Sequence, residues 1–271
     1  MVVFHRTASS SIDTAIPLAR TSLDPVVSDI VYLGGLVGEE DNRISGAFDR
    51  IKRFFDIIFS GAALVLLSPL ILAASIIIKL ESGGSVFYKQ ERIGLNRRSS
   101  DRRGSASSGY SGPDRRERND RRKKIHAGKP FNIYKLRTMR SDAEKAGPTL
   151  SCKGDPRITK IGHLLRRTRI DELPQFINVL QGDMSIVGPR PERSFFINQV
   201  RQEVPEFPLR LKVKPGITGL AQVEDGYTET VEQMTGKLYY DLKYIAGLSV
   251  LQEIKILFKT ISVVITGKGA C

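Results

Sequence analysis

Residues 57–78 carry no charge and read IIFSGAALVLLSPLILAASIII, whereas Lys52 and Arg53 lie just before the run and Lys79 follows it. At about 1.5 Å per residue, a helix of this length measures about 33 Å, close to the roughly 30 Å hydrocarbon layer of a bilayer. The pattern therefore predicts a membrane helix.

Ser68 and Pro69 interrupt this apolar run in its middle. Proline has no amide donor and clashes with the carbonyl four residues earlier, and the residue before a proline avoids helical angles. A break here leaves two half-helices of about 17 Å, each long enough to enter one leaflet but not to cross. Length alone fits a single span and a helix-break-helix hairpin equally well, and fits a buried core helix less well.

Shorter periodic segments follow the membrane run. The segments SVFYKQERIGL and KPFNIYKLRTM are typical of strands, and ITKIGHLLRRT has its apolar residues at helical spacing. A further helix is predicted to begin at Asp171, with Pro174 in its first turn and Gly182 at its end. Together they predict an α+β fold that is mostly helical, with a small β-hairpin.

The C-terminal segment LSVLQEIKILFKTISVVIT predicts an amphipathic helix. It places Leu251, Ile254, Phe258 and Ile261 on one face and the lysines elsewhere. That apolar face suits either the plane of a membrane interface or the surface of the main domain.

Two stretches lack any hydrophobic period. Residues 1–45 are rich in Ser, Thr, Asp and Gly and predict a disordered N-terminal tail. Residues 97–128 predict a disordered basic insert, in which residues 97–124 hold eleven basic and four acidic side chains. A solvated loop is favoured there over a nucleic-acid-binding module, and anionic phospholipid headgroups would attract it. The chain thus divides into the tail, a membrane helix over 46–80 and a main domain over 81–271.

Charge and cysteine content narrow the function. The formal net charge is +13, which points to an anionic partner such as a phosphorylated substrate or a phospholipid surface. The two cysteines form no CxxC or Cys/His cluster, which argues against a disulfide framework or a zinc site. The chain contains no GxxxxGK[ST] loop and no DxD motif.

The adjacent acids Asp171 and Glu172 are the candidate catalytic residues. An exposed Asp-Glu pair in a first helical turn often only caps the helix dipole. Here many basic residues are close in sequence, and cations that surround a carboxylate would lower its pKa and keep it ionised, as a nucleophile or a magnesium ligand requires. These basic residues are Arg157, Arg166, Arg167, Arg169 and Arg190.

The tripeptide Pro189-Arg190-Pro191 is a candidate phosphate-binding element. Two prolines restrict the backbone around one guanidinium, and a rigidly held arginine suits a phosphate group. A tight structural turn with a surface arginine explains the same residues equally well.

Several ordered motifs resemble the monotopic polyprenyl-phosphate glycosyl-1-phosphate transferases, a family of bacterial sugar transferases that includes exopolysaccharide enzymes of the ExoY type. The similarity runs from about residue 48 to the C-terminus. The motifs are KRFFDII, Ser68-Pro69, YKQERIGLN, KPFNIYKLRTM, DPRITKIGHLLRRTRIDELPQFINVLQGDMSIVGPRP and KPGITGLAQV.

This resemblance implies a re-entrant membrane helix bent at Ser68-Pro69, with both ends on the cytoplasmic face of the bacterial inner membrane. It also implies that Asp171 attacks the β-phosphorus of a UDP-sugar, that UMP leaves, and that polyprenyl (undecaprenyl) phosphate then accepts the sugar phosphate in exopolysaccharide biosynthesis. Glu172 corresponds to the family's Mg²⁺ ligand.

Further substrate-binding residues follow from the same resemblance. Arg166 and Arg190, with Pro189 and Pro191 beside the latter, match phosphate-binding positions, and Lys135 and Arg137 belong to a KxRTM block near the site. Galactose and glucose are the leading sugars for an ExoY-type enzyme. The oligomeric state stays open, a homodimer being one option, and no nucleic-acid partner is expected.

The basic insert departs from the family pattern, in which RIGLN passes almost directly to KPF. Two other functions fit parts of the sequence. A membrane-tethered binding protein would use the basic loop but would not need an arginine-rich acidic pair, and a conventional glycosyltransferase would release UDP instead of UMP.

Overall fold

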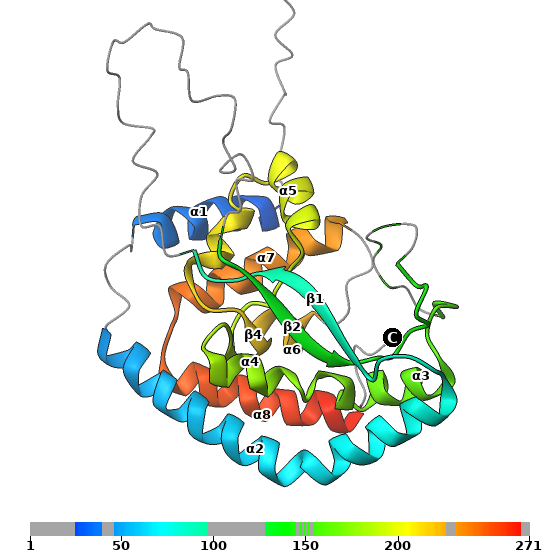
Figure 1. Cartoon of the computed structure of the whole chain (residues 1–271). Coiled ribbons are helices and arrows are strands. Elements are labelled where there is room, and N and C mark those ends of the chain that lie inside the picture. The colour runs from blue at the N-terminus through cyan, green and yellow to red at the C-terminus, as the bar shows by residue number, and fades with distance from the viewer. Residues whose placement is uncertain are drawn as a thin grey trace, which may run out of the picture.

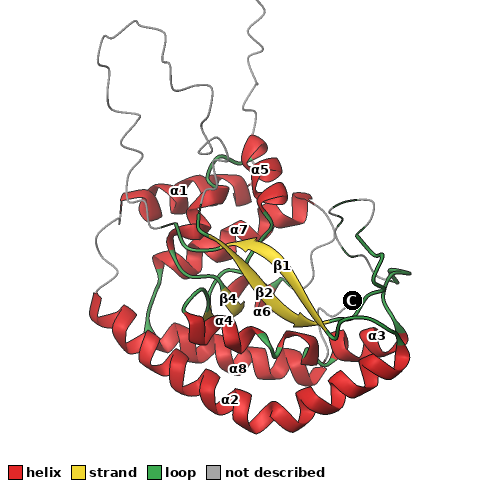
Figure 2. Cartoon of the chain, viewed as in Figure 1, coloured by secondary structure: helices red, strands yellow, loops and turns green. Residues whose placement is uncertain are grey.

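The computed structural model describes residues 25–39, 46–96, 128–144, 147, 149, 151, 154–225 and 231–266. Helices form most of this structure, and the strands make two small sheets (Figure 2). The elements are α1 (Pro25–Glu39), α2 (Gly46–Glu81), β1 (Phe87–Ile93), β2 (Pro130–Leu136), α3 (Lys160–Arg167), η2 (Ile170–Glu172), α4 (Gln175–Gln181), β3 (Ser185–Val187), α5 (Ser194–Glu203), η3 (Phe207–Lys212), β4 (Gly216–Thr218), α6 (Leu220–Glu224), α7 (Val231–Ala246) and α8 (Val250–Thr266).

Helix α2 contains the whole apolar run and is bent in its middle (Figure 1). Pro69 lies inside the helix and cannot donate to the carbonyl of Val65. The hydroxyl of Ser68 donates to this carbonyl instead, at 2.8 Å. The prediction of two separate half-helices is therefore wrong in one respect, because the helical backbone continues through the bend.

Both ends of α2 contact the same protein body. Near its N-terminal end, the Asp56 carboxylate accepts a hydrogen bond from the backbone N–H of Ile186 in β3, at 3.0 Å. At its C-terminal end, the Glu81 carboxylate accepts one from the backbone N–H of Ile161 in α3, at 3.1 Å. The helix is thus held at each end, and its bend points away from the sheets.

Strands β1 and β2 pair antiparallel, with Phe87 opposite Leu136 and Ile93 opposite Pro130. This pair confirms the predicted β-hairpin. The basic insert connects the two strands, and its residues 97–127 lie outside the described structure. A second, parallel pair formed by β3 and β4 was not predicted, because three-residue strands carry too little hydrophobic period.

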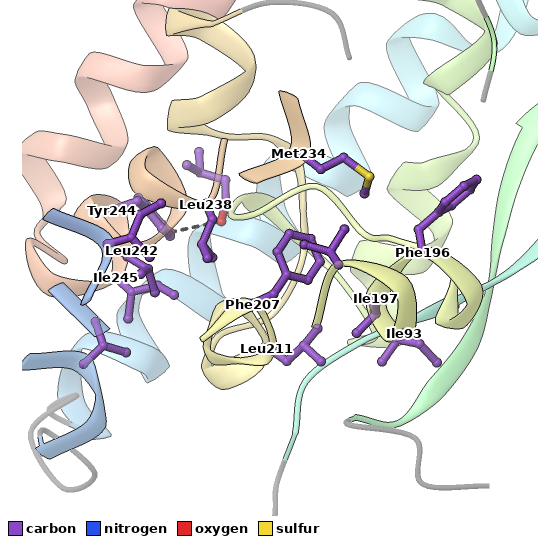
Figure 3. Close-up of a cluster of buried hydrophobic side chains, with 14 of the residues drawn as sticks. Ile93, Phe196, Ile197, Phe207, Leu211, Met234, Leu238, Leu242, Tyr244 and Ile245 are labelled. Carbon is purple, nitrogen blue, oxygen red and sulfur yellow. Dashed lines mark hydrogen bonds between the residues drawn. The ribbon is translucent and has the colours of Figure 1, made fainter. Parts of the chain in front are cut away.

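The largest core surrounds α7 and takes side chains from α1, α5, η3 and α8 (Figure 3). Ile30 and Val37 of α1 are buried in it. The predicted disordered tail over 1–45 is therefore wrong for residues 25–39, whose apolar face packs on α7 and η3. The rest of that tail lies outside the described residues.

Helices α2 and α8 expose many large apolar side chains. Figure 1 shows both helices on one side of the molecule and α1 on the opposite side. On α8 the predicted apolar face is exposed, whereas Ile256 turns inward to the core. Among the described residues, α2 alone is long and apolar enough to cross a membrane.

Candidate active site

Asp171 and Glu172 lie in η2, a 3₁₀ helix of one turn between α3 and α4. The prediction that they begin the next α-helix is wrong by one turn, because α4 begins at Gln175. Gly182 ends α4 at a positive φ of 85°, as predicted. Arg169, just before η2, has a φ of 58° and is the one non-glycine residue with positive φ among those described. Such strain costs on the order of 1–3 kcal/mol and is typical of functional sites.

Glu172 is buried between two cations. Its Oε1 accepts a hydrogen bond from Lys135 Nζ at 2.7 Å and from Arg190 Nη2 at 2.9 Å. Burial by itself would raise the pKa of Glu172, but Arg190, Lys135 and Arg169 outweigh burial and hold this pKa well below its usual range. Glu172 is therefore ionised at neutral pH, and the structure brings together two of the predicted substrate-binding residues around it.

Asp171 is as deeply buried as Glu172, with 5% of the residue exposed against 7%, but its surroundings differ. Its buried Oδ1 has no hydrogen-bond partner. Burial and then the charge of Glu172 raise the pKa of Asp171 to about 6, against the opposing effect of Lys135, Arg166 and Arg169. The arginines lower this pKa as expected, but the expected net decrease is wrong, because desolvation is the larger effect.

Asp171 and Glu172 line a pocket of about 320 Å³. Arg166 also lines it and is held by Thr138 Oγ1 at 2.9 Å and Ser151 Oγ at 2.8 Å. Of the other arginines near the acids in sequence, Arg157 instead pairs with Asp155 at 2.5 Å, and Arg167 is exposed outside the pocket.

The backbone of Arg190, which follows β3, is held by a second arginine. Its carbonyl accepts a hydrogen bond from Arg210 Nη2 at 3.0 Å, and Arg210 forms a buried ion pair with Asp241 at 2.8 Å. Pro189 and Pro191 do not line the pocket. They restrict the backbone on either side of Arg190, so their contribution is to its position.

Arg137 lines the pocket, but its hydrogen bonds are to residues of a loop and not to Asp171 or Glu172. Its guanidinium donates to the carbonyls of Gly83 and Ser82, at 2.6 and 2.8 Å. These residues belong to the loop that joins α2 to β1. Of the two predicted KxRTM residues, Lys135 thus contacts Glu172, whereas Arg137 contacts the loop that follows α2.

A polar network that was not predicted lines another part of the pocket. Gln90 Nε2 donates to Tyr88 Oη and to Glu144 Oε1, both at 2.9 Å, and Arg193 Nη1 donates to the same Glu144 oxygen at 2.8 Å. The sequence signal was limited to spacing: residues two apart in a strand share a face, so the predicted strand places Tyr88, Gln90 and Arg92 together. Glu144 and Arg193 carried no such signal.

Among the described residues, no group of three or more His, Cys, Asp or Glu side chains could hold a metal ion alone. Mg²⁺ nevertheless binds commonly through one or two carboxylates together with water and substrate phosphates. The adjacent acids, with one unpartnered buried carboxylate oxygen, fit an ion of this kind.

Comparison with known proteins adds independent information. Residues 47–101 and 118–267 match the profile of the bacterial sugar transferase family. A UDP-N-acetylgalactosamine-undecaprenyl-phosphate N-acetylgalactosaminephosphotransferase of Aeromonas hydrophila is 39% identical over 220 residues, which are 81% of this chain and 45% of that protein. A UDP-glucose:undecaprenyl-phosphate glucose-1-phosphate transferase of Escherichia coli (strain K12) is 39% identical over 223 residues, which are 82% of this chain and 41% of that protein.

A third relative is similar along almost its whole length. The exopolysaccharide production protein PSS of Rhizobium leguminosarum bv. phaseoli is 36% identical over 226 residues, which are 81% of this chain and 98% of that protein. The chain spans less than half the length of the first two relatives. The profile match covers most of the chain and includes every residue placed in the pocket above, so this protein belongs to the bacterial sugar transferase family.

Proposed function

We propose that this protein transfers a hexose-1-phosphate from a UDP-sugar to undecaprenyl phosphate and releases UMP, as the first step of exopolysaccharide synthesis. The names of the Aeromonas and Escherichia coli relatives describe this type of reaction with two different sugars. The name of the Rhizobium relative supports the role in exopolysaccharide production.

The observation that carries the proposal is the environment of Asp171. Its carboxylate is buried in a cation-lined pocket and keeps one oxygen without a hydrogen-bond partner. A structural carboxylate in such a place would normally be paired, whereas a nucleophile needs a free oxygen. Lys135, Arg166 and Arg190 supply the positive charge that stabilises phosphoryl transfer.

The proposed chemistry has two steps. A carboxylate oxygen of Asp171 attacks the β-phosphorus of the UDP-sugar, and the bond from this phosphorus to the bridging oxygen breaks, so that UMP leaves with that oxygen. A phosphate oxygen of the lipid then attacks the same phosphorus, and the Asp171 carboxylate leaves with its electron pair. The products are a lipid-diphosphate sugar and the free enzyme.

The charge partners have separate tasks in this scheme. Arg190 and Lys135 keep Glu172 ionised and are themselves oriented by it. We propose that Glu172 would hold Mg²⁺, which would supply positive charge for phosphoryl transfer when bound. Arg166, which donates to Thr138 and Ser151, would bind a phosphate oxygen.

We further propose that α2 is a re-entrant helix in the inner membrane, with both ends on the cytoplasmic side. The hydrogen bonds of Asp56 and Glu81 hold its two ends to one body, which a membrane-crossing helix could not satisfy. Its exposed apolar side chains and those of α8 would enter one leaflet.

Product analysis tests this function. The full-length protein in detergent is incubated with undecaprenyl phosphate, Mg²⁺ and a panel of UDP-sugars, and the nucleotides released are separated by chromatography. Release of UMP with formation of the lipid-linked sugar is expected for one sugar or a few. Release of UDP would indicate a conventional glycosyltransferase, and no release with any sugar would favour the binding-protein alternative.

A further inference from the structure

The segment that carries Asp171 rests directly on the second half of α2. Ile170, the residue before Asp171, packs against a cluster that contains Ala74 and Ile78 of α2. Leu136, which follows Lys135, belongs to this cluster and also lines the pocket. The same side chain thus separates the pocket from the part of α2 that follows the bend.

Large apolar side chains remain exposed next to this point. Ile77 and Leu80 of α2 are 45% and 81% exposed, and Phe87 at the start of β1 is 46% exposed. Phe87 lies opposite Leu136 in the hairpin, and directly opposite residues point to the same face of a sheet. Phe87 is therefore on the α2 side of the hairpin. Figure 1 shows the start of β1 beside the C-terminal end of α2.

Positive charge lies between this apolar surface and the pocket. Arg137 lines the pocket and donates to the loop between α2 and β1, as described above. Lys79 Nζ donates to the carbonyl of Gly84 in this loop at 3.0 Å. Gly84 has a φ of +103°, and a Cβ there would lie 2.7 Å from Arg137 Nη1, so the guanidinium packs directly on the loop backbone.

We propose that the edge formed by Ile77, Leu80, Phe87 and Arg137 binds the phosphate end of the polyprenyl acceptor and leads it to Asp171. This inference rests on the proposed function and specifies where the second substrate approaches. A polyprenyl phosphate needs apolar groups around its chain and cations around its phosphate. This edge supplies apolar side chains and the Arg137 guanidinium, and Arg137 lines the same pocket as Asp171.

The first half of α2 does not offer the same arrangement. There Asp56 and Ser60 are buried, and Arg53 donates to the carbonyls of Val179 and Leu180 at the end of α4. Val179 and Leu180 are near the C-terminal end of α4, whereas η2 precedes its N-terminal end. The surface that adjoins the residue before Asp171 belongs to the second half of α2.

The two half-reactions allow a test. Phe87→Ser and Leu80→Ser are compared with the wild type in detergent. Tyr32→Ser serves as the control, because Tyr32 is 68% exposed and belongs to α1, which lies on the opposite side of the molecule from α2. UMP released per enzyme from UDP-sugar without acceptor is measured first. The KM for undecaprenyl phosphate and for soluble farnesyl phosphate is measured next.

Phe87→Ser and Leu80→Ser are expected to leave the UMP burst intact and to raise the KM for both acceptors, by roughly fivefold to tenfold, because apolar contact is lost. Tyr32→Ser should change neither value. Unchanged KM in both variants would overturn the inference, as would a rise confined to the long acceptor, which would mean that the residues only seat the protein in the membrane. A lost burst in a folded variant would also overturn it, since the residues would then support the pocket. A wild type that releases no UMP would instead refute the proposed function.

Discussion

Asp171 and Glu172 are consecutive residues, yet their surroundings give them opposite electrostatic properties. Two cations donate to Glu172 and hold its pKa low, whereas burial raises the pKa of Asp171 to about 6. A carboxylate with a higher pKa is the better nucleophile, and one that stays ionised is the better metal ligand. The assignment of one role to each acid thus follows from their contacts.

The raised pKa of Asp171 predicts a pH dependence. Only the ionised carboxylate can attack, so kcat/KM for the UDP-sugar should be constant well above pH 6 and fall about tenfold per pH unit below it. Initial rates of UMP release between pH 4.5 and 8.5 check this. A profile that stays flat down to pH 4.5 would show that the burial of Asp171 does not govern its ionisation.

Glu172→Gln tests the second acid. The amide keeps the shape of the side chain but removes the charge that would hold Mg²⁺ and orient Lys135 and Arg190. We expect a higher Mg²⁺ concentration for half-maximal activity and slower rates in both half-reactions. Glu224→Gln on α6, which pairs with Lys259 outside the pocket, is the matched control. An unchanged Mg²⁺ dependence in Glu172→Gln would remove Glu172 from the proposed metal site.

At the scale of elements, α2 keeps its helical backbone through a proline because a neighbouring hydroxyl replaces the missing bond. Ser68 donates to the carbonyl that Pro69 leaves free, and in an apolar environment an unsatisfied carbonyl is costly. The residue pair thus produces a bend with little loss of hydrogen bonding.

This geometry predicts that both ends of α2 face the cytoplasm. In a variant that lacks Cys152 and Cys271, single cysteines at Ala47, in the first turn of α2, and at Ser85, after its end, should react with a membrane-impermeant thiol reagent only after the inner membrane is opened. Pro69→Leu should restore an unbroken apolar helix and shift part of the population to a span, with one end labelled from outside. External labelling of the wild type at either position would contradict the re-entrant topology.

The elements also show what the sequence could and could not predict. The apolar run, the β-hairpin and α3 were predicted because their hydrophobic periods are long and clear. Helix α1 was missed although Ile30, Leu33 and Val37 have helical spacing, because its surroundings are rich in Gly and Ser. Strands β3 and β4 depend on partners distant in the chain, which no local pattern reveals.

At the scale of the whole molecule, folding assembles the pocket from segments far apart in sequence. The acidic pair and its arginines could be predicted as residue types, and the resemblance added Lys135. The pocket network around Glu144 and the support of Arg190 by Arg210 could not be predicted, because they arise only from packing between elements. The different pKa values of the two acids likewise depend on burial.

Backbone hydrogen bonds join the two ends of the hairpin where the basic insert begins and ends. Gly94 N–H donates to the carbonyl of Lys129 at 2.8 Å, and Lys129 N–H donates to the carbonyl of Leu95 at 3.2 Å. Replacement of residues 99–124 by a short Gly-Ser turn should therefore preserve the pocket and the turnover in detergent. Binding to anionic liposomes should weaken in a salt-sensitive manner, because net positive charge is removed. Loss of turnover in a folded deletion variant would contradict this prediction.

The most direct test of the central claim is mass spectrometry of the protein after incubation with a UDP-sugar and Mg²⁺ in the absence of lipid acceptor. We expect an added hexose phosphate, located by peptide mapping at Asp171, with one UMP released per adduct. Asp171→Asn should show neither adduct nor UMP, and its unfolding temperature at pH 7.5 should not fall, since the variant removes a buried charge. Normal turnover by Asp171→Asn, or an adduct on another residue, would contradict Asp171 as the nucleophile.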